Sequence, residues 1–196
     1  MKRAYGYVPS PKDNRDIFFQ PMGATPEEYV LENVPGPFDQ GMAPICAAVT
    51  LGTITGWQQG IRGLKPNLDF FEIYDLRDDK NMEGMVPRQA LSAFKKQGVD
   101  GYKIKAYARI DSVAAAKSAI QVNGPILLAT MAYADDYEFW RPNGQPGGGH
   151  ATTLVGWKKE GFILQNSWGY SFGTGGRIIF PFEDWKHVME AWTIMI

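Results

Sequence analysis

The spacing of apolar residues changes near Gly101, and this change constrains the fold more than any other feature of the chain. Before it, apolar residues recur at helical spacing. After it, short runs rich in branched and aromatic residues alternate with glycine-bearing turns, a pattern typical of strands. The order favours an α+β protein whose helical lobe and strand-rich lobe meet at a groove. We expect helices at residues 46–59, after an Asp69 cap, at 86–97 and at 112–122, and strands at residues 102–107, 125–131, 151–157, 162–166, 177–181 and 191–196.

Residues 1–39, which we call the N-terminal arm, lack this periodicity. They carry many prolines, glycines and charges, so we expect an extended segment that wraps the surface. The rest of the chain is expected to form a mainly helical lobe, residues 40–100, and a mainly β lobe, residues 101–196. All 196 residues are then one structural unit.

The charge balance excludes several classes of partner. Twenty basic and 21 acidic side chains leave a formal charge of −1. Such a balanced chain has no strong positive potential that would attract nucleic acid or an anionic membrane. No apolar stretch has the length of a membrane span, and none of signal-peptide length follows Met1. We therefore expect small or peptidic partners, and a chain from which no leader or inhibitory pro-segment has been removed.

Cysteine and histidine usage narrows the chemistry. A single cysteine forms no internal disulfide, so a reducing cytoplasm suits the chain. One cysteine and two distant histidines provide no zinc ligand set, and we expect no metal and no cofactor.

That single cysteine, Cys46, opens the first expected helix two residues after Pro44. The first turn of a helix has unpaired backbone N–H groups and a partial positive charge, which favour the thiolate. The thiolate is the nucleophilic form, so the position suits a catalytic cysteine. Taken alone, the same residue is interpreted as a small buried hydrophobe, since free cysteine is among the most buried residue types.

Two further motifs lie far downstream of Cys46. Three glycines precede His150 at the start of an expected strand, and Asn166 opens the run Asn-Ser-Trp-Gly sixteen residues later. With Gln40, six positions before the cysteine, these residues occur in an order that resembles the papain-like cysteine peptidases. The first 39 residues resemble the opening of bacterial and phage-type members that have no long propeptide.

The resemblance implies a fold and a reaction. The fold is a helical lobe and an antiparallel β-barrel-like lobe with the active-site cleft between them, and the reaction is hydrolysis of peptide bonds. Cys46 would attack the carbonyl carbon, and His150 would hold the thiolate and then protonate the leaving amine. Asn166 would fix the imidazole tautomer, and Gln40 would donate its side-chain amide to the oxyanion.

Four further positions are expected to bind substrate. Gly84 has no side chain, so the backbone of an extended substrate could pair with it. Met85 suits an adaptable apolar pocket wall, Gly149 lies in the glycine run before the histidine, and Trp168 would keep water from the histidine. Their plainer interpretations are gap filling for Met85, a flexible turn for Gly149 and core packing for Trp168.

The chain also departs from the family pattern. Ala43-Pro44-Ile45-Cys46-Ala47 replaces the usual Cys-Gly-Ser-Cys-Trp, and His150 and Asn166 follow Cys46 by 104 and 120 residues, fewer than the roughly 130 to 150 typical of the family. We place the deletions in loops of the helical lobe and before the histidine. Because of these departures, two alternative functions remain open. The chain could be a catalytically silent peptide- or protein-binding module, or an isopeptidase or acyltransferase that uses the same site. The N-terminal arm either covers the groove or only braces the two lobes.

Overall fold

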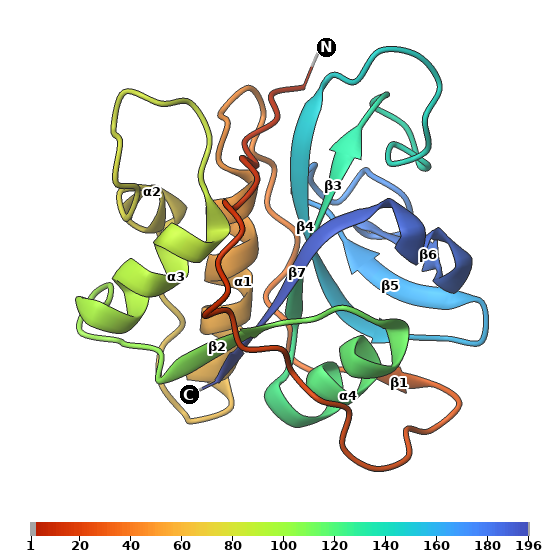
Figure 1. Cartoon of the computed structure of the whole chain (residues 1–196), viewed down its shortest axis with the longest axis horizontal. Helices are drawn as coiled ribbons and strands as arrows, with labels where there is room; N and C mark the ends of the chain where they lie inside the picture. The colour runs from red at the N-terminus through yellow and green to blue at the C-terminus, as the bar shows by residue number, and fades with distance from the viewer. Residues whose placement is uncertain (1–2, 196) are drawn as a thin grey trace.

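The computed structural model describes residues 3–195, and the helices of residues 46–96 and most of the sheet lie on opposite sides of the N-terminal segment (Figure 1). Helices α1 (Cys46–Gly60), α2 (Phe70–Tyr74) and α3 (Pro87–Lys96) form one side, and α1 packs against β3 and β4 of the sheet. Helix α4 (Val113–Asn123) packs against β3, β4 and β7. Within the described residues no helix combines the length and apolar character needed to cross a bilayer.

Local sequence sets the helix ends. Helix α1 is buried along almost its whole length because its residues are mostly apolar or small. The Asp69 carboxylate caps α2 by accepting hydrogen bonds of 3.1 Å from the N–H groups of Phe71 and Glu72, as expected, although this helix is only one turn long. Helix α3 ends before Gly98, whose φ of 80° suits glycine.

The strand-rich side is one antiparallel sheet in the order β2-β7-β3-β4-β5-β6, with β1 paired to β4. Within residues 3–195 the edge strands β2 and β6 do not pair, so the sheet is not closed into the barrel that the resemblance suggested. The strands are β1 (Tyr29–Val30), β2 (Ala106–Arg109), β3 (Ile126–Ala132), β4 (Gly148–Trp157), β5 (Gly161–Gln165), β6 (Arg177–Pro181) and β7 (Val188–Met195).

Two strands differ most from the sequence prediction, and β4 and β7 each begin three residues earlier than expected. The strand expected at residues 102–107 begins only at Ala106, because Tyr102 and Val99 exchange backbone hydrogen bonds of 2.9 Å in a tight turn. Strand β1 lies inside the N-terminal arm, where we expected none, and pairs with Trp157 and Gly156. A Cβ at Gly156 would lie 2.4 Å from the Tyr29 carbonyl oxygen, so glycine permits this approach. Ile196, the end of the last expected strand, lies outside the described residues.

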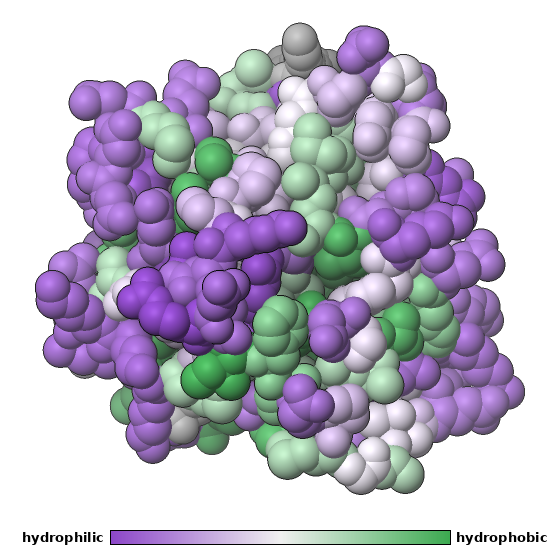
Figure 2. Space-filling view, viewed as in Figure 1, coloured by the Kyte–Doolittle hydropathy of each residue, from purple (hydrophilic) through white to green (hydrophobic). Residues whose placement is uncertain are grey.

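The beginning of the N-terminal arm runs between the helices and the sheet. Tyr7 forms a parallel bridge with Met85, just before α3, and an antiparallel bridge with Gly149 at the start of β4. In Figure 1 this is the red segment that passes between α3 and β4. Figure 2 shows the same face in space-filling form. Pale and green residues form a band between hydrophilic residues, and no open groove runs along this band. Peptide backbone therefore already occupies the junction where we expected a groove.

Candidate active site

Cys46 lies at the first residue of α1, with its side chain fully buried. Its Sγ accepts a hydrogen bond of 3.2 Å from the Gly6 N–H and one of 3.5 Å from the Ala151 N–H. Ala151 directly follows His150 on β4. The fold therefore brings the start of α1, the strand that carries His150, and the N-terminal arm together at one sulfur atom.

His150 is held by contacts on several sides. Its Nε2 lies 2.7 Å from Asn166 Oδ1, and the same oxygen accepts a 2.8 Å hydrogen bond from the Ser167 N–H. Trp168 stacks on the imidazole at 4.9 Å between ring centroids, and the edge of Phe139 lies 5.2 Å away. Asn166 Oδ1 thus selects the tautomer with a proton on Nε2. Nδ1 is the ring nitrogen left for proton transfer, since within residues 3–195 it is buried without a hydrogen-bond partner.

Gln40 is oriented by contacts at both ends of its amide. Ser167 Oγ donates to Gln40 Oε1, and Gln40 Nε2 donates to the carbonyl oxygens of Ala43 at 2.8 Å and Ala4 at 3.0 Å. Ala4 belongs to the N-terminal arm, so one of these two N–H groups becomes available if the arm leaves. That N–H, like the N–H of Cys46 at the helix start, is a donor of the kind that stabilises an oxyanion.

The positions expected to bind substrate contact the arm. The Met85 N–H donates to the Gly6 carbonyl at 2.8 Å, the Val8 N–H donates to the Met85 carbonyl at 3.0 Å, and the Tyr7 N–H donates to the Gly149 carbonyl at 3.0 Å. Gly84 itself is not paired with the arm, but a Cβ there would lie 2.9 Å from the Gly6 carbonyl oxygen. An extended peptide thus fits this cleft through main-chain pairing.

The arm runs through the cleft in an orientation that does not present a carbonyl to the sulfur. An N–H group, that of Gly6, points at Cys46 Sγ, and residues 7 and 8 pair in parallel with Met85. Nucleophilic attack needs a carbonyl carbon at the sulfur with its oxygen near hydrogen-bond donors. The contact that the arm makes with the sulfur is therefore through an N–H group, which differs from the approach that nucleophilic attack requires.

Burial changes the protonation of both Cys46 and His150. Loss of solvent raises the pKa of Cys46 to about 11, although hydrogen bonds from the Ala151 and Gly6 N–H groups oppose this. Loss of solvent also lowers the pKa of His150 to about 4, although its hydrogen bond to Asn166 opposes the change. In the covered state the pair is a neutral thiol and a neutral imidazole at pH 7.

A partly buried cluster of ion pairs joins the next part of the arm to the body of the protein. Arg88 on α3 pairs with Asp13, and Arg109 on β2 lies 3.4 Å from Asp16. Arg109 also lies 3.0 Å from the Glu190 carboxylate on β7, whose side chain is 1% exposed. Removal of one partner from such a shielded pair would leave an uncompensated charge, so these contacts link Asp13 and Asp16 of the arm to α3 and β2.

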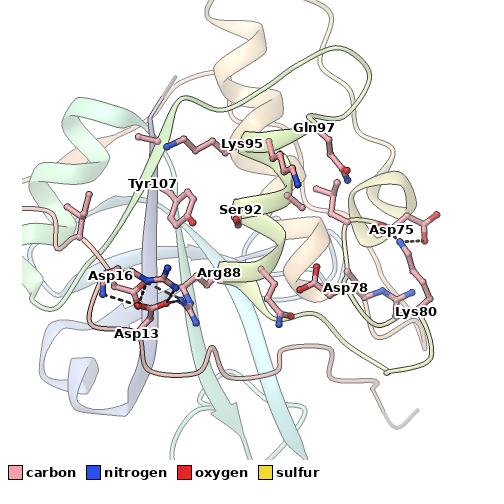
Figure 3. Close-up of a pocket in the computed structure, with 18 residues that line it drawn as sticks. Asp13, Asp16, Asp75, Asp78, Lys80, Arg88, Ser92, Lys95, Gln97 and Tyr107 are labelled. Carbon is pink, nitrogen blue, oxygen red and sulfur yellow. Dashed lines mark hydrogen bonds and ion pairs between the residues drawn. The ribbon is translucent and has the colours of Figure 1, made fainter.

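A wide groove in the described structure lies away from the cysteine. It is a groove of about 890 Å³ between α3, the loop after α2 and arm residues 13–17. Figure 3 shows Asp13, Asp16 and Arg88 paired along one side of it, with Asp75 and Lys80 at the other end. None of the predicted catalytic residues lines this groove. Residues 3–195 contain no group of three or more His, Cys, Asp or Glu side chains placed to hold a metal ion.

Comparison with known proteins places the chain in a family. A model of papain family cysteine proteases matches residues 73–183, more than half of the chain. The chain belongs to the papain family of cysteine proteases. The matched segment contains His150 and Asn166 but begins after Cys46. The cysteine is therefore brought beside these residues by the fold and is not part of the family match.

Individual relatives agree with this placement. The chain is 31% identical over 84 residues to a gut-specific cysteine proteinase of Caenorhabditis elegans, an alignment that covers 38% of the chain and 26% of the relative. The chain thus spans about a quarter of the length of this curated relative.

Solved structures show the same fold over nearly the whole chain. Xylellain, a cysteine protease from Xylella fastidiosa, superposes with a TM-score of 0.84 at 21% identity, covering 98% of this chain and 96% of that one. Procathepsin B S9 from Trypanosoma congolense superposes with a TM-score of 0.80 at 14% identity, covering 96% and 85%. At these identities the likeness shows the fold alone.

Sequence reasoning missed several residues that build the site. Ser167 orients both Asn166 and Gln40, and its place inside the Asn-Ser-Trp-Gly run was the available signal. Tyr5 packs edge-on against His150, with 5.8 Å between the ring centroids, and donates a 2.6 Å hydrogen bond to Asp135. No pattern in the sequence singled out Glu190, because its importance depends on contacts between distant strands.

Proposed function

We propose that the chain is a cysteine peptidase that hydrolyses peptide bonds through an acyl-enzyme on Cys46. In this mechanism the thiolate attacks the carbonyl carbon, and the oxyanion accepts hydrogen bonds from Gln40 Nε2 and the Cys46 N–H. His150, through Nδ1, takes the thiol proton and passes it to the leaving amine, and Asn166 keeps the ring in place. A water molecule, deprotonated by His150, then attacks the acyl carbon and releases Cys46.

One observation carries most of the proposal. A peptide segment lies extended across the cleft, hydrogen-bonded to Met85 and Gly149, and its Gly6 N–H lies 3.2 Å from Cys46 Sγ. A site that holds main chain against a sulfur at a helix N-terminus suits a peptide or protein substrate. We include the cytoplasm in the proposal as the compartment, because a lone unpaired cysteine suits reducing conditions.

We also propose that the arm-covered form is a resting state, and that the arm must leave before a substrate enters. Gly6 provides a direct test, since a Cβ at this position would lie 2.0 Å from the Pro44 carbonyl oxygen. The Gly6→Ala substitution therefore excludes the arm from its position without touching a predicted catalytic residue.

The experiment compares Gly6→Ala with the double variant Gly6→Ala/Cys46→Ala. We expect the first to cleave members of a peptide library and to react with a thiol-directed epoxide, and the second to do neither. Equal peptide turnover by the two variants would refute the role of Cys46 and with it the proposed function.

The second candidate is a catalytically silent peptide-binding module. The observation that favours it is the complete burial of Cys46 and His150 as a neutral pair. The pH dependence of alkylation in the Gly6→Ala variant separates the two. A thiolate reactive near pH 5 indicates a Cys46–His150 ion pair and a peptidase, whereas reactivity that rises only near the free-thiol pKa of about 8.5 indicates the silent module.

A further inference from the structure

The part of the cleft that pairs with the arm follows a loop that has no regular structure. Residues 75–84 belong to no helix or strand, and in Figure 1 this loop leads from α2 to Met85 and α3. The Met85 N–H donates to the Gly6 carbonyl, and the Met85 carbonyl accepts from the Val8 N–H. The Met85 side chain is buried in the core. The direction of its main-chain groups therefore depends on how the loop before it is held.

The hydroxyl of Tyr74 holds the end of this loop. Tyr74 is the last residue of α2, and its hydroxyl accepts a 2.9 Å hydrogen bond from the Gly84 N–H. Gly84 is buried with a φ of 90°, a conformation that suits glycine. The bond fixes the peptide unit between Glu83 and Gly84. This unit lies directly before Met85, so the hydroxyl acts on the residue that pairs with the arm.

Arg77 joins Tyr74 to the same loop. Its guanidinium lies over the Tyr74 ring, 3.5 Å from the ring centroid. Its Nε donates to the Tyr74 carbonyl at 2.8 Å, and its Nη1 donates to the Met82 carbonyl at 2.6 Å. A guanidinium over an aromatic face is attractive, and its planar fork reaches two carbonyls at once. Arg77 thus restrains the Tyr74 ring and the loop together.

Few other contacts hold this segment in place. Within residues 3–195, every hydrogen bond to the backbone of residues 82–84 comes from the side chain of Tyr74 or Arg77. Cys46 is the only cysteine, so no disulfide restrains the loop. An irregular segment with few hydrogen bonds leaves its native geometry at a low free-energy cost. The two side chains therefore determine how often Met85 is aimed at the cleft.

We propose that Tyr74 is a positioning residue for peptide binding. Through Gly84 it keeps the N–H and carbonyl of Met85 aimed at the backbone of an extended peptide, and Arg77 keeps Tyr74 in place. For a substrate, this inference rests on the peptidase activity proposed above. For the arm it does not, because the arm pairs with Met85 whether or not the chain is an enzyme.

One factor should describe the effect of losing the hydroxyl. If only a fraction of the open molecules then has Met85 correctly aimed, every peptide that pairs with Met85 binds more weakly by that fraction. Loss of one hydrogen bond corresponds to a factor of about three to ten. Among the described residues Tyr74 forms no hydrogen bond with a predicted catalytic residue, so the chemical step should not change.

The first experiment does not depend on catalysis. Alkylation of Cys46 by iodoacetamide in the full chain requires the arm to open, so its rate at pH 7 reports how tightly Met85 holds the arm. We expect Tyr74→Phe, which loses only the hydroxyl, to raise this rate by about three- to tenfold. Tyr137→Phe, at an exposed tyrosine, is the matched control and should leave the rate unchanged. Circular dichroism verifies that both variants are folded.

The second experiment is a double-mutant cycle with Arg77→Lys. This substitution keeps the positive charge but loses the fork that reaches two carbonyls, so it should also raise the alkylation rate. Because both residues act through one loop, the double variant Tyr74→Phe/Arg77→Lys should react about as fast as the faster single variant. Two unrelated stabilising contacts would instead give the product of the two single effects.

The third experiment measures turnover in the Gly6→Ala variant. We expect Tyr74→Phe to raise KM for a peptide substrate by the same factor as the alkylation rate, with kcat unchanged. The comparison substrate is 4-nitrophenyl acetate, an ester that has no peptide backbone to pair with Met85. Its turnover should stay the same, whereas a general disturbance of the active site would lower the turnover of both substrates.

The outcomes separate this inference from the proposed function. The positioning role is overturned, and the peptidase left intact, if Tyr74→Phe changes neither the alkylation rate nor the peptide KM, or changes one without the other. Independent effects in the double variant, or ester turnover that falls with peptide turnover, overturn it as well. If Gly6→Ala cleaves neither substrate while the alkylation results are as expected, the peptidase proposal fails and Tyr74 is a positioning residue for the arm alone. Should Tyr74→Phe fail to fold, the effects of Arg77→Lys on alkylation and on KM decide.

Discussion

Displacing the arm by the Gly6→Ala substitution should increase the reactivity of Cys46 by orders of magnitude. The new Cβ would lie 2.0 Å from the Pro44 oxygen and 2.2 Å from the Pro44 carbonyl carbon, both backbone atoms that have little freedom to move. Burial under the arm raises the pKa of Cys46 to about 11. At pH 7 that pKa corresponds to a thiolate fraction of about 10⁻⁴, against about 3% for a free cysteine of pKa about 8.5. Exposure alone should therefore accelerate alkylation by about 300-fold, and an ion pair with His150 would increase this further.

The assay is the second-order rate of iodoacetamide alkylation at pH 7, followed by mass spectrometry on the intact chain. Gly60→Ala is the matched control, since a Cβ at Gly60 would come no closer than 3.9 Å to Pro66. We expect the control to react at the native rate, with circular dichroism verifying that both variants are folded. An unchanged rate in folded Gly6→Ala would show that the arm does not control access to the sulfur.

Three further results are expected, the first two in the Gly6→Ala background. Gln40→Ala should lower kcat by about 10²- to 10³-fold with little change in KM, as loss of an oxyanion donor does elsewhere, and a larger effect on KM would contradict this role. Ser167→Ala should lower kcat by about tenfold, because it removes only the hydrogen bond that orients the Gln40 amide. A loss of kcat as large as that caused by Gln40→Ala would argue against an indirect role for Ser167. In the otherwise native chain, acid should open the arm, because the covered form lowers the pKa of His150 from 6.5 to about 4 and so binds fewer protons than the open form between these values. The contribution of His150 to the stability of the covered form is then fully present above about pH 6.5. It is lost as the pH falls toward 4, by about 2 kcal/mol at pH 5. Hydrogen exchange at the Tyr7 amide, corrected for its intrinsic rate, measures the change, and equal protection at pH 7 and pH 5 would contradict it.

Local sequence was sufficient for most of the fold. The caps at Asp69 and Ser112, the glycine after α3 and the apolar run after Cys46 each act within a few residues, so the helices begin and end near their predicted positions. Strand β1 and the open edges of the sheet depend on pairing between distant segments. A two-residue strand has too little sequence to carry a signal of its own.

The same division applies to the site. The order of Gln40, Cys46, His150 and Asn166 and the Asn-Ser-Trp-Gly run predicted the reacting groups, because each proposed role needs a particular functional group. Only the tertiary structure decided that the N-terminal arm occupies the cleft and that Ser167 orients Gln40. These facts depend on contacts across 40 and 127 positions of sequence, and a linear pattern carries no information about which distant backbones will fill the same space.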